Sequence, residues 1–186
     1  MNNTYKSLFL LDPKVTYLNH GSFGACPKPI FDSLISWQKK LELNPVKHLA
    51  FDIYKYLENS RQHLSQYINC NKDDIVFFPN PSTALNAVIK SLDLNSGDEI
   101  LTTNHEYGAL DKTWNFICKK TGAKYIKQNI KLPLQSKKDF INAFINGINK
   151  QTKIIFMSHI TSPTGLIFPV KDICEIAKEN NIFCII

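Results

Sequence analysis

The chain has 186 residues, of which 44% are hydrophobic and 20% are charged, close to the average for globular proteins. No apolar run is long enough to cross a membrane, and the one near the N-terminus is too short for a signal peptide, so we expect a soluble, cytoplasmic protein. The formal net charge is +6, but Arg61 is the only arginine and the lysines are spread along the chain. Because nucleic-acid binding relies on arginine forks and clustered basic patches, no nucleic-acid partner is indicated. No membrane partner is expected either.

The cysteines are five in number, an odd count, and no two of them form a Cys-x-x-Cys pair. This spacing indicates neither a zinc site nor a disulfide framework, and no other metal site is indicated. We therefore expect reduced, buried thiols at positions 26, 70, 118, 174 and 184.

Residues 1–71 are expected to form an N-terminal segment with two helices. Apolar residues recur at helical spacing in the stretches KPIFDSLISWQKKLEL and FDIYKYLENSRQHLSQYI. Arg61 falls within the second apolar face, so we expect an internally paired anchor rather than a ligand-binding group. The apolar positions are Ile30, Leu34, Trp37 and Leu41 in the first helix and Ile53, Leu57, Leu64 and Ile68 in the second.

Residues 72–186 alternate between apolar runs typical of strands and amphipathic stretches typical of helices. This alternation predicts an α/β fold with a mainly parallel sheet and flanking helices. The five predicted strands are 74–78, 99–103, 123–130, 153–159 and 182–186. The helices between them place these residues on their apolar faces: Leu85, Val88, Ile89 and Leu92; Leu110, Trp114 and Ile117; Phe140, Ala143 and Phe144; and Ile173, Ile176 and Ala177.

Ligands of open parallel sheets bind outside the carboxyl ends of the strands, so a binding site is expected in the loops at that edge. The stretch PNPSTALNAV brings Ser82 and Thr83 to a helix start, where unpaired N–H groups and hydroxyls favour an anion such as a phosphate. The alternative is that Ser82 is only a helix N-cap.

Two further loops follow predicted strands at the same edge. TTNHEYGAL supplies His105 and Tyr107, and an aromatic ring there could lie against a planar ligand; the alternative is that both are packing residues. MSHITSPTGLIFPV supplies Ser158, His159, Thr161 and Ser162. Together, an anion site, an aromatic ring and hydrogen-bonding side chains describe a site for a flat phosphorylated cofactor.

Four stretches in series resemble class V aminotransferases of the pyridoxal-phosphate fold type I. They are YLNHGSFGACPKPI, PNPSTALNAV, NHEYGALDKTWNFICKKTGAK and SHITSPTGLIFPVKDI. LNHGSFGA and HEYGAL are most similar to the isopenicillin N epimerase-like branch. The resemblance implies pyridoxal 5'-phosphate as cofactor, an amino acid as the small-molecule substrate and a homodimer of the full-length protein.

The resemblance also implies roles for individual residues. Ser82 and Thr83 would hold the cofactor phosphate, and Tyr107 would stack on the pyridine ring, with His105 as the rival. Ser162 or Thr161 would face the phenolic oxygen of the ring; the cysteine desulfurase branch commonly has Asn there, which makes that chemistry less favoured.

A further segment, Asn19, His20 and Gly21, matches the part of the family that approaches the substrate. The alternative is that NHGSFG is only a glycine turn.

The mechanism implied by the resemblance uses a Schiff-base lysine and an Asp that pairs with the pyridine nitrogen. In the family this Asp follows the strand that corresponds to 182–186, and the lysine comes later, so we expect an incomplete enzyme without catalytic residues of its own. Transamination, epimerisation and β-elimination all stay open. Two alternatives remain: a non-catalytic α/β module that binds a nucleotide or phosphometabolite and, within the family, a cysteine desulfurase or lyase.

Overall fold

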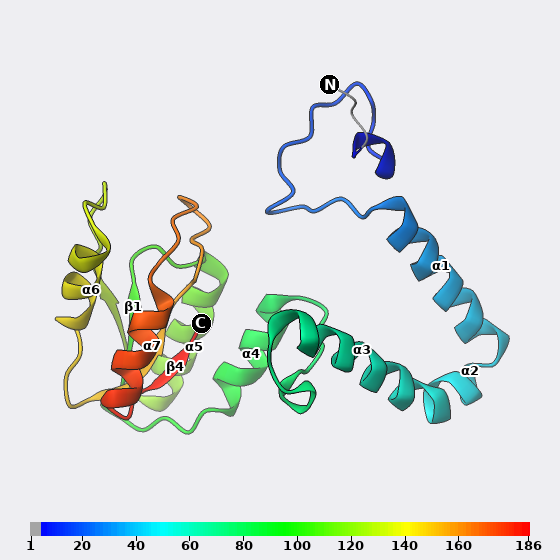
Figure 1. Cartoon of the computed structure of the whole chain (residues 1–186). Coiled ribbons are helices and arrows are strands. Elements are labelled where there is room, and N and C mark those ends of the chain that lie inside the picture. The colour runs from blue at the N-terminus through cyan, green and yellow to red at the C-terminus, as the bar shows by residue number, and fades with distance from the viewer. Residues whose placement is uncertain (1–4) are drawn as a thin grey trace. The chain divides into compact units, whose positions relative to one another are not determined.

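The computed structural model describes residues 5–186, which divide into two compact units between Val76 and Phe77 (Figure 1). The sequence predicted a boundary a few residues earlier, between 71 and 72. Within the described residues no helix is both long and apolar enough to span a membrane.

The first unit contains the two predicted helices, α1 (Lys28–Leu43) and α3 (Ile53–Ile68). Both have defined ends: Pro29 lies in the first turn of α1, and α3 ends at Asn69, which has a left-handed backbone with φ 55°. Shorter helical turns lie before, between and after them in the chain: η1 (Lys6–Leu8), α2 (Pro45–Lys47), η2 (His48–Asp52) and η3 (Lys72–Asp74).

The apolar faces of α1 and α3 remain largely exposed. No residue of α1 is buried, and Trp37 contacts Tyr56 edge-to-face with a 4.8 Å centroid separation while 44% of its surface stays exposed. The prediction that Arg61 has an internal partner was wrong: within residues 5–186 it forms no ion pair, and its buried Nε has no hydrogen-bond partner. Position on an apolar face therefore did not determine pairing.

The second unit is a parallel sheet whose strands alternate with helices, which confirms the predicted fold class. The strand order is β2-β1-β3-β4, and every neighbouring pair is parallel. In chain order the elements are α4 (Pro81–Ser91), β1 (Glu99–Thr103), α5 (Gly108–Thr121), β2 (Lys124–Gln128), α6 (Lys137–Ile145), β3 (Thr152–Phe156), α7 (Val170–Glu179) and β4 (Phe183–Ile185).

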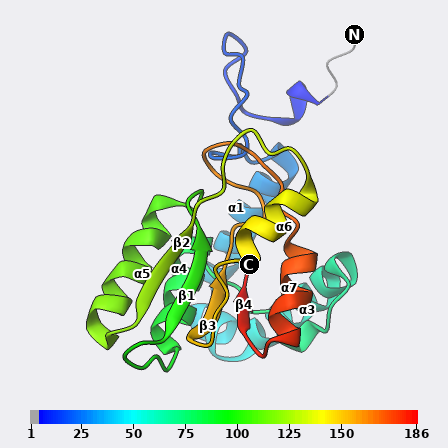
Figure 2. The same cartoon turned by 90° about the vertical axis from the view of Figure 1, so that its left-hand side faces the viewer.

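Helices α4 and α5 cover one face of the sheet, and α6 and α7 cover the other (Figure 2). Successive strand residues point to opposite faces, so Ile100 packs against the first pair of helices and Leu101 against the second. Trp114 from α5 and Phe144 from α6 are fully buried in the two cores. This double-sided core fixes the strand ends from which the candidate site is built.

The first predicted strand, 74–78, is not a strand. Asp74 ends the turn η3, and the residues after it pair with no strand of the described chain. Val76, Phe77 and Phe78 are 74%, 47% and 43% exposed. An apolar run becomes a strand only when a neighbour completes its hydrogen-bond ladder, and none lies beside this one.

The cysteines are less buried than predicted. Only Cys118 is buried, because it lies on the core face of α5, whereas Cys26 and Cys70 are exposed in the first unit. Cys174 and Cys184 are half-buried.

Candidate functional site

The carboxyl edge of the sheet gathers the loops that the sequence indicated. β1 and β3 are parallel neighbours, so the loops that follow them leave the sheet at the same edge. α5 starts directly after β1, and α4 lies beside it. Thr113 Oγ1 of α5 donates to Asn86 Oδ1 of α4 at 3.2 Å, and each of these is the sixth residue of its helix. The N-terminal halves of both helices therefore contact each other, and because α5 begins at this edge, the start of α4 lies near it.

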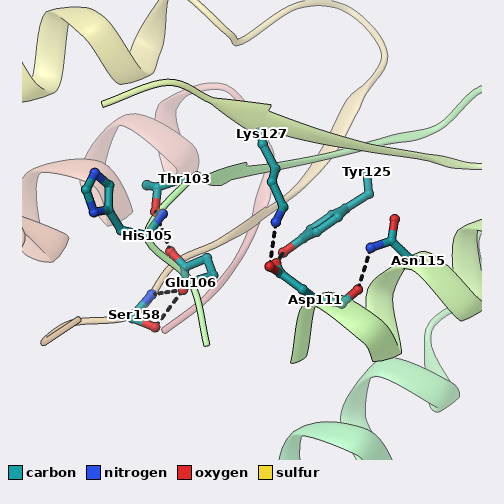
Figure 3. Close-up of polar contacts among 8 residues, drawn as sticks. All are labelled: Thr103, His105, Glu106, Asp111, Asn115, Tyr125, Lys127 and Ser158. Carbon is teal, nitrogen blue, oxygen red and sulfur yellow. Dashed lines mark hydrogen bonds and ion pairs between the residues drawn. The ribbon is translucent and has the colours of Figure 1, made fainter. Parts of the chain in front are cut away.

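A buried carboxylate that the sequence analysis did not single out joins the two strand ends (Figure 3). Glu106, 6% exposed, accepts from the Thr103 hydroxyl at 2.7 Å and from the Ser158 N–H at 2.9 Å, and also from the Ser158 hydroxyl. The sequence did offer a signal for Glu106, because it is an acidic residue between the candidates His105 and Tyr107, just after a predicted strand.

His105 is buried and bonded to the protein. It is 8% exposed, its Nε2 lies 2.8 Å from the Ile130 carbonyl oxygen, and its ring meets Phe168 edge-on at 6.0 Å. Tyr107, two residues later, is 49% exposed and makes no side-chain hydrogen bond or ring contact within residues 5–186. Of the two aromatic candidates, Tyr107 is therefore the one with a free ring.

The start of α4 is capped by Asn80, not by Ser82. Asn80 Oδ1 accepts from the Thr83 N–H at 2.8 Å and from its hydroxyl at 3.0 Å, so the proposed N-cap role of Ser82 was wrong. Neither the N–H nor the hydroxyl of Ser82 forms a hydrogen bond within residues 5–186, whereas its carbonyl accepts from Asn86 Nδ2 at 2.9 Å. Ser82 is thus held in place with two free donors.

In the loop after β3, one of the two hydroxyl candidates is bonded to the protein and the other is free. Thr161, 2% exposed, hydrogen bonds to the Thr164 hydroxyl at 2.6 Å and accepts from the Leu166 N–H at 3.1 Å. Ser162 is exposed and its hydroxyl has no partner within residues 5–186. His159 instead lines a pocket of about 620 Å³ beside α6 and the start of α7, and none of the other predicted site residues lines it.

A second polar group lies beside this network (Figure 3). Asp111 of α5 accepts from the Tyr125 hydroxyl at 2.8 Å and pairs with Lys127, both on β2. Burial raises the pKa of Tyr125, so this phenol stays protonated and acts as a donor. The arrangement anchors the first turn of α5 to the outer strand.

Asn19, His20 and Gly21 lie in the first unit. His20 packs edge-on against Tyr17 at 4.8 Å and accepts from the Ala25 N–H at 3.4 Å, and the Asn19 carbonyl accepts from the Phe23 N–H at 3.0 Å. The segment forms a local turn. Its predicted role at the substrate stays a prediction.

The free groups at the carboxyl edge fit a flat phosphorylated ligand. Ser82 offers two donors at a helix N-terminus, which suit an anion; Tyr107 offers a free ring; and Ser162 offers a free hydroxyl. Among the other predicted residues, the rivals His105 and Thr161 each have a polar side-chain atom bonded to the protein. Thr83, predicted to hold the phosphate together with Ser82, has its N–H and hydroxyl bonded to Asn80.

Comparison with known sequences identifies a family. The family model described as aminotransferase class-V matches residues 17–186. The chain is 29% identical over 181 residues to isopenicillin N epimerase of Amycolatopsis lactamdurans, covering 95% of this chain and 45% of that protein. It is 21% identical over 185 residues to a probable chloroplastic L-cysteine desulfhydrase of Arabidopsis thaliana, covering 92% and 39%. The chain thus spans less than half the length of these curated relatives.

Solved structures show the same fold. A form of C-DES with glycine covalently linked to its PLP cofactor matches with a TM-score of 0.82 at 24% identity, over 92% of this chain and 45% of that one. The apo cysteine desulfurase of Thermococcus onnurineus NA1 matches with a TM-score of 0.80 at 22% identity, over 99% and 46%.

Proposed function

Because the chain belongs to the class V aminotransferase family, we propose that it forms the N-terminal part of a pyridoxal-phosphate-dependent enzyme that acts on amino acids. One observation carries the proposal: three groups of the types that this cofactor requires, at Ser82, Tyr107 and Ser162, are free at one edge of the sheet. The chain spans about 45% of the isopenicillin N epimerase it matches, so the proposed activity is that of the longer enzyme.

Each residue has a defined task in this proposal. Ser82 would donate hydrogen bonds from its hydroxyl and N–H to the phosphate, next to the positive end of the α4 dipole. Tyr107 would stack on the pyridine ring, and Ser162 would donate to the phenolic oxygen of the ring. When bound, pyridoxal phosphate supplies an electron sink that lets an amino acid release its α-proton.

The surrounding residues position this set. Asn86 links the carbonyl of Ser82 to Thr113, so the first turn of α4 is held against α5. Glu106 holds Ser158 at the end of β3 and directly precedes Tyr107 in the chain. The two loops that carry Tyr107 and Ser162 are therefore joined at their bases.

Within the family, we favour aminotransferase or epimerase chemistry over cysteine desulfuration. The support is Ser162, which stands where the resemblance to desulfurases would place Asn, together with the 29% identity to an isopenicillin N epimerase. The desulfhydrase and desulfurase relatives keep carbon–sulfur cleavage as the second candidate. The two differ in their products, since carbon–sulfur cleavage removes sulfur from the amino acid, whereas transamination and epimerisation leave its side chain intact.

The phosphate site can be tested with deoxypyridoxine phosphate, a cofactor analogue whose missing aldehyde prevents reaction with lysines. We expect the purified chain to bind it and Ser82→Ala to weaken binding by at least about tenfold, because a hydrogen bond to a charged group contributes roughly 1.5 to 3 kcal/mol. Ser91→Ala, at the opposite end of α4, is the matched control. Equal affinity of the two variants would remove Ser82 from the site. A chain that does not bind the analogue but is thermally stabilised by a nucleotide would instead support the alternative of a non-catalytic α/β module that binds a nucleotide or phosphometabolite.

A further inference from the structure

Two cysteines of the second unit lie side by side. Sγ of Cys174, in α7, is 3.6 Å from Sγ of Cys184, in β4. The chain reverses between them through Asn181, which has a left-handed backbone with φ 55°, and the Ile182 N–H donates to the Ala177 carbonyl at 2.8 Å. This tight turn, which is independent of the cofactor site, holds the end of the helix against the strand.

The pair is also supported from within the core. Ile173 and Ala177, on either side of Cys174 in α7, are fully buried in the core cluster against which Cys184 packs. The two sulfurs are therefore neighbours because of helix–strand packing rather than through a flexible loop. A disulfide requires the sulfurs to approach to about 2 Å, so the two side chains must rotate toward each other when the bond forms.

Within this 186-residue chain the pair can be reached from solvent. Both cysteines are half-buried, and both line a surface pocket of about 470 Å³ together with Lys178 and Asn181. The positive charge of Lys178 favours an anionic reagent in this pocket. The remaining thiols provide a contrast within the described chain, since Cys26 and Cys70 are exposed and Cys118 is buried.

We propose that Cys174 and Cys184 form a thiol–disulfide exchange site that reacts with a small anionic disulfide of the glutathione type. The Cys174 thiolate attacks one sulfur of the reagent, breaking its S–S bond and releasing one thiolate that takes up a proton. The Cys184 thiol then loses its proton to solvent and attacks Cys174, releasing the second thiol. In total, one disulfide is reduced to two thiols and the two cysteines are oxidised to one disulfide.

The order of attack follows from the surroundings of the two sulfurs. Burial, followed by the neighbouring Cys174, raises the pKa of Cys184 to about 12, which disfavours it as the first nucleophile. After Cys174 has formed the mixed disulfide, its thiol no longer opposes ionisation of Cys184. The mixed disulfide is then within reach of Cys184, so the second step proceeds inside one molecule.

Peptide mapping tests the pairing directly, because trypsin cleavage at Lys171 and Lys178 leaves one cysteine in each of the peptides 172–178 and 179–186. The folded chain, carrying Cys26→Ser and Cys70→Ser, is incubated with oxidised glutathione, alkylated and digested. We expect the two peptides to be recovered as one disulfide-linked species, with Cys118 alkylated only after unfolding.

Two single variants test the order of attack. In this background, Cys184→Ser should accumulate glutathione on Cys174, whereas Cys174→Ser should leave Cys184 unmodified over the same time. Glutathione uptake at Cys26 and Cys70 of the parent chain, without a linked 172–178 and 179–186 pair, would overturn the proposal. A stable glutathione adduct on Cys174 that Cys184 does not resolve would overturn it as well.

Discussion

The carboxylate of Glu106 accepts two hydrogen bonds from Ser158, 52 residues further along the chain, one from its backbone N–H at 2.9 Å and one from its hydroxyl. Glu106 follows β1 and Ser158 follows β3, so this buried contact joins the carboxyl ends of two neighbouring strands. The loop that carries Tyr107 is thereby fixed to the loop that carries Ser162.

Replacing Glu106 by Gln should destabilise the second unit. The amide presents a donor to groups that are themselves donors, so at least one of them loses its acceptor, at a cost of about 1–3 kcal/mol. Denaturant unfolding of the purified chain measures the loss. The control is Glu175→Gln, on an exposed position of α7, which should leave the free energy of unfolding nearly unchanged. Equal stability of the two variants would contradict a structural role for the carboxylate.

Replacing Asn80 by Ala should weaken the start of α4. Asn80 accepts from the Thr83 N–H and hydroxyl, and loss of such an N-cap typically costs about 1 kcal/mol. Asn80→Asp keeps the acceptor and should retain most of the stability. If Asp and Ala lower the free energy of unfolding equally, the cap does not contribute in this way.

The sequence predicted the sheet and its helices well because their apolar residues repeat at regular intervals. Trp114 and Phe144, for example, were assigned to apolar helix faces and are fully buried. The strand at 74–78 failed because an apolar run does not reveal whether another strand lies beside it. The surroundings of His105 and Glu106 depend on Ile130 and Ser158, which are distant in sequence, and no periodicity encodes such contacts. The apolar periodicity around Arg61 likewise did not show that its Nε lacks a hydrogen-bond partner.

The stability of the chain should fall above about pH 8.5, the usual pKa of a free thiol, partly because of Cys118. Burial raises the pKa of Cys118 to about 11, so the folded chain keeps this proton after the unfolded chain has lost it. A raised folded-state pKa stabilises fully below the unfolded value, and the contribution is lost as pH rises toward about 11.

Cys118→Ala should therefore show a shallower decline in the free energy of unfolding from about pH 8.5 to 11 than the parent chain. Cys26→Ala, which removes an exposed thiol, should keep the parent slope. Tyr125 and Cys184, whose pKa values are also raised, are present in every chain compared, so their contributions cancel in the difference. Parallel curves for Cys118→Ala and the parent would show that the thiol proton does not contribute.

Tyr107 and His105 should respond to mutation in opposite ways. Tyr107 has a free, half-exposed ring, so Tyr107→Ala should weaken binding of deoxypyridoxine phosphate without lowering the free energy of unfolding. Aromatic stacking contributes about 0.5–1.5 kcal/mol, which corresponds to a loss of affinity between about twofold and tenfold. Tyr107→Phe retains the ring and should bind as the parent does.

His105→Ala should instead lower stability, because it leaves the Ile130 carbonyl without its buried partner. Its effect on the analogue should be small at temperatures where the variant remains folded. The two measurements, analogue affinity and free energy of unfolding, separate a residue that contacts the cofactor from one that supports the loop. If His105→Ala loses affinity while Tyr107→Ala does not, the histidine contacts the ring and the assignment made from the free and occupied side chains is wrong.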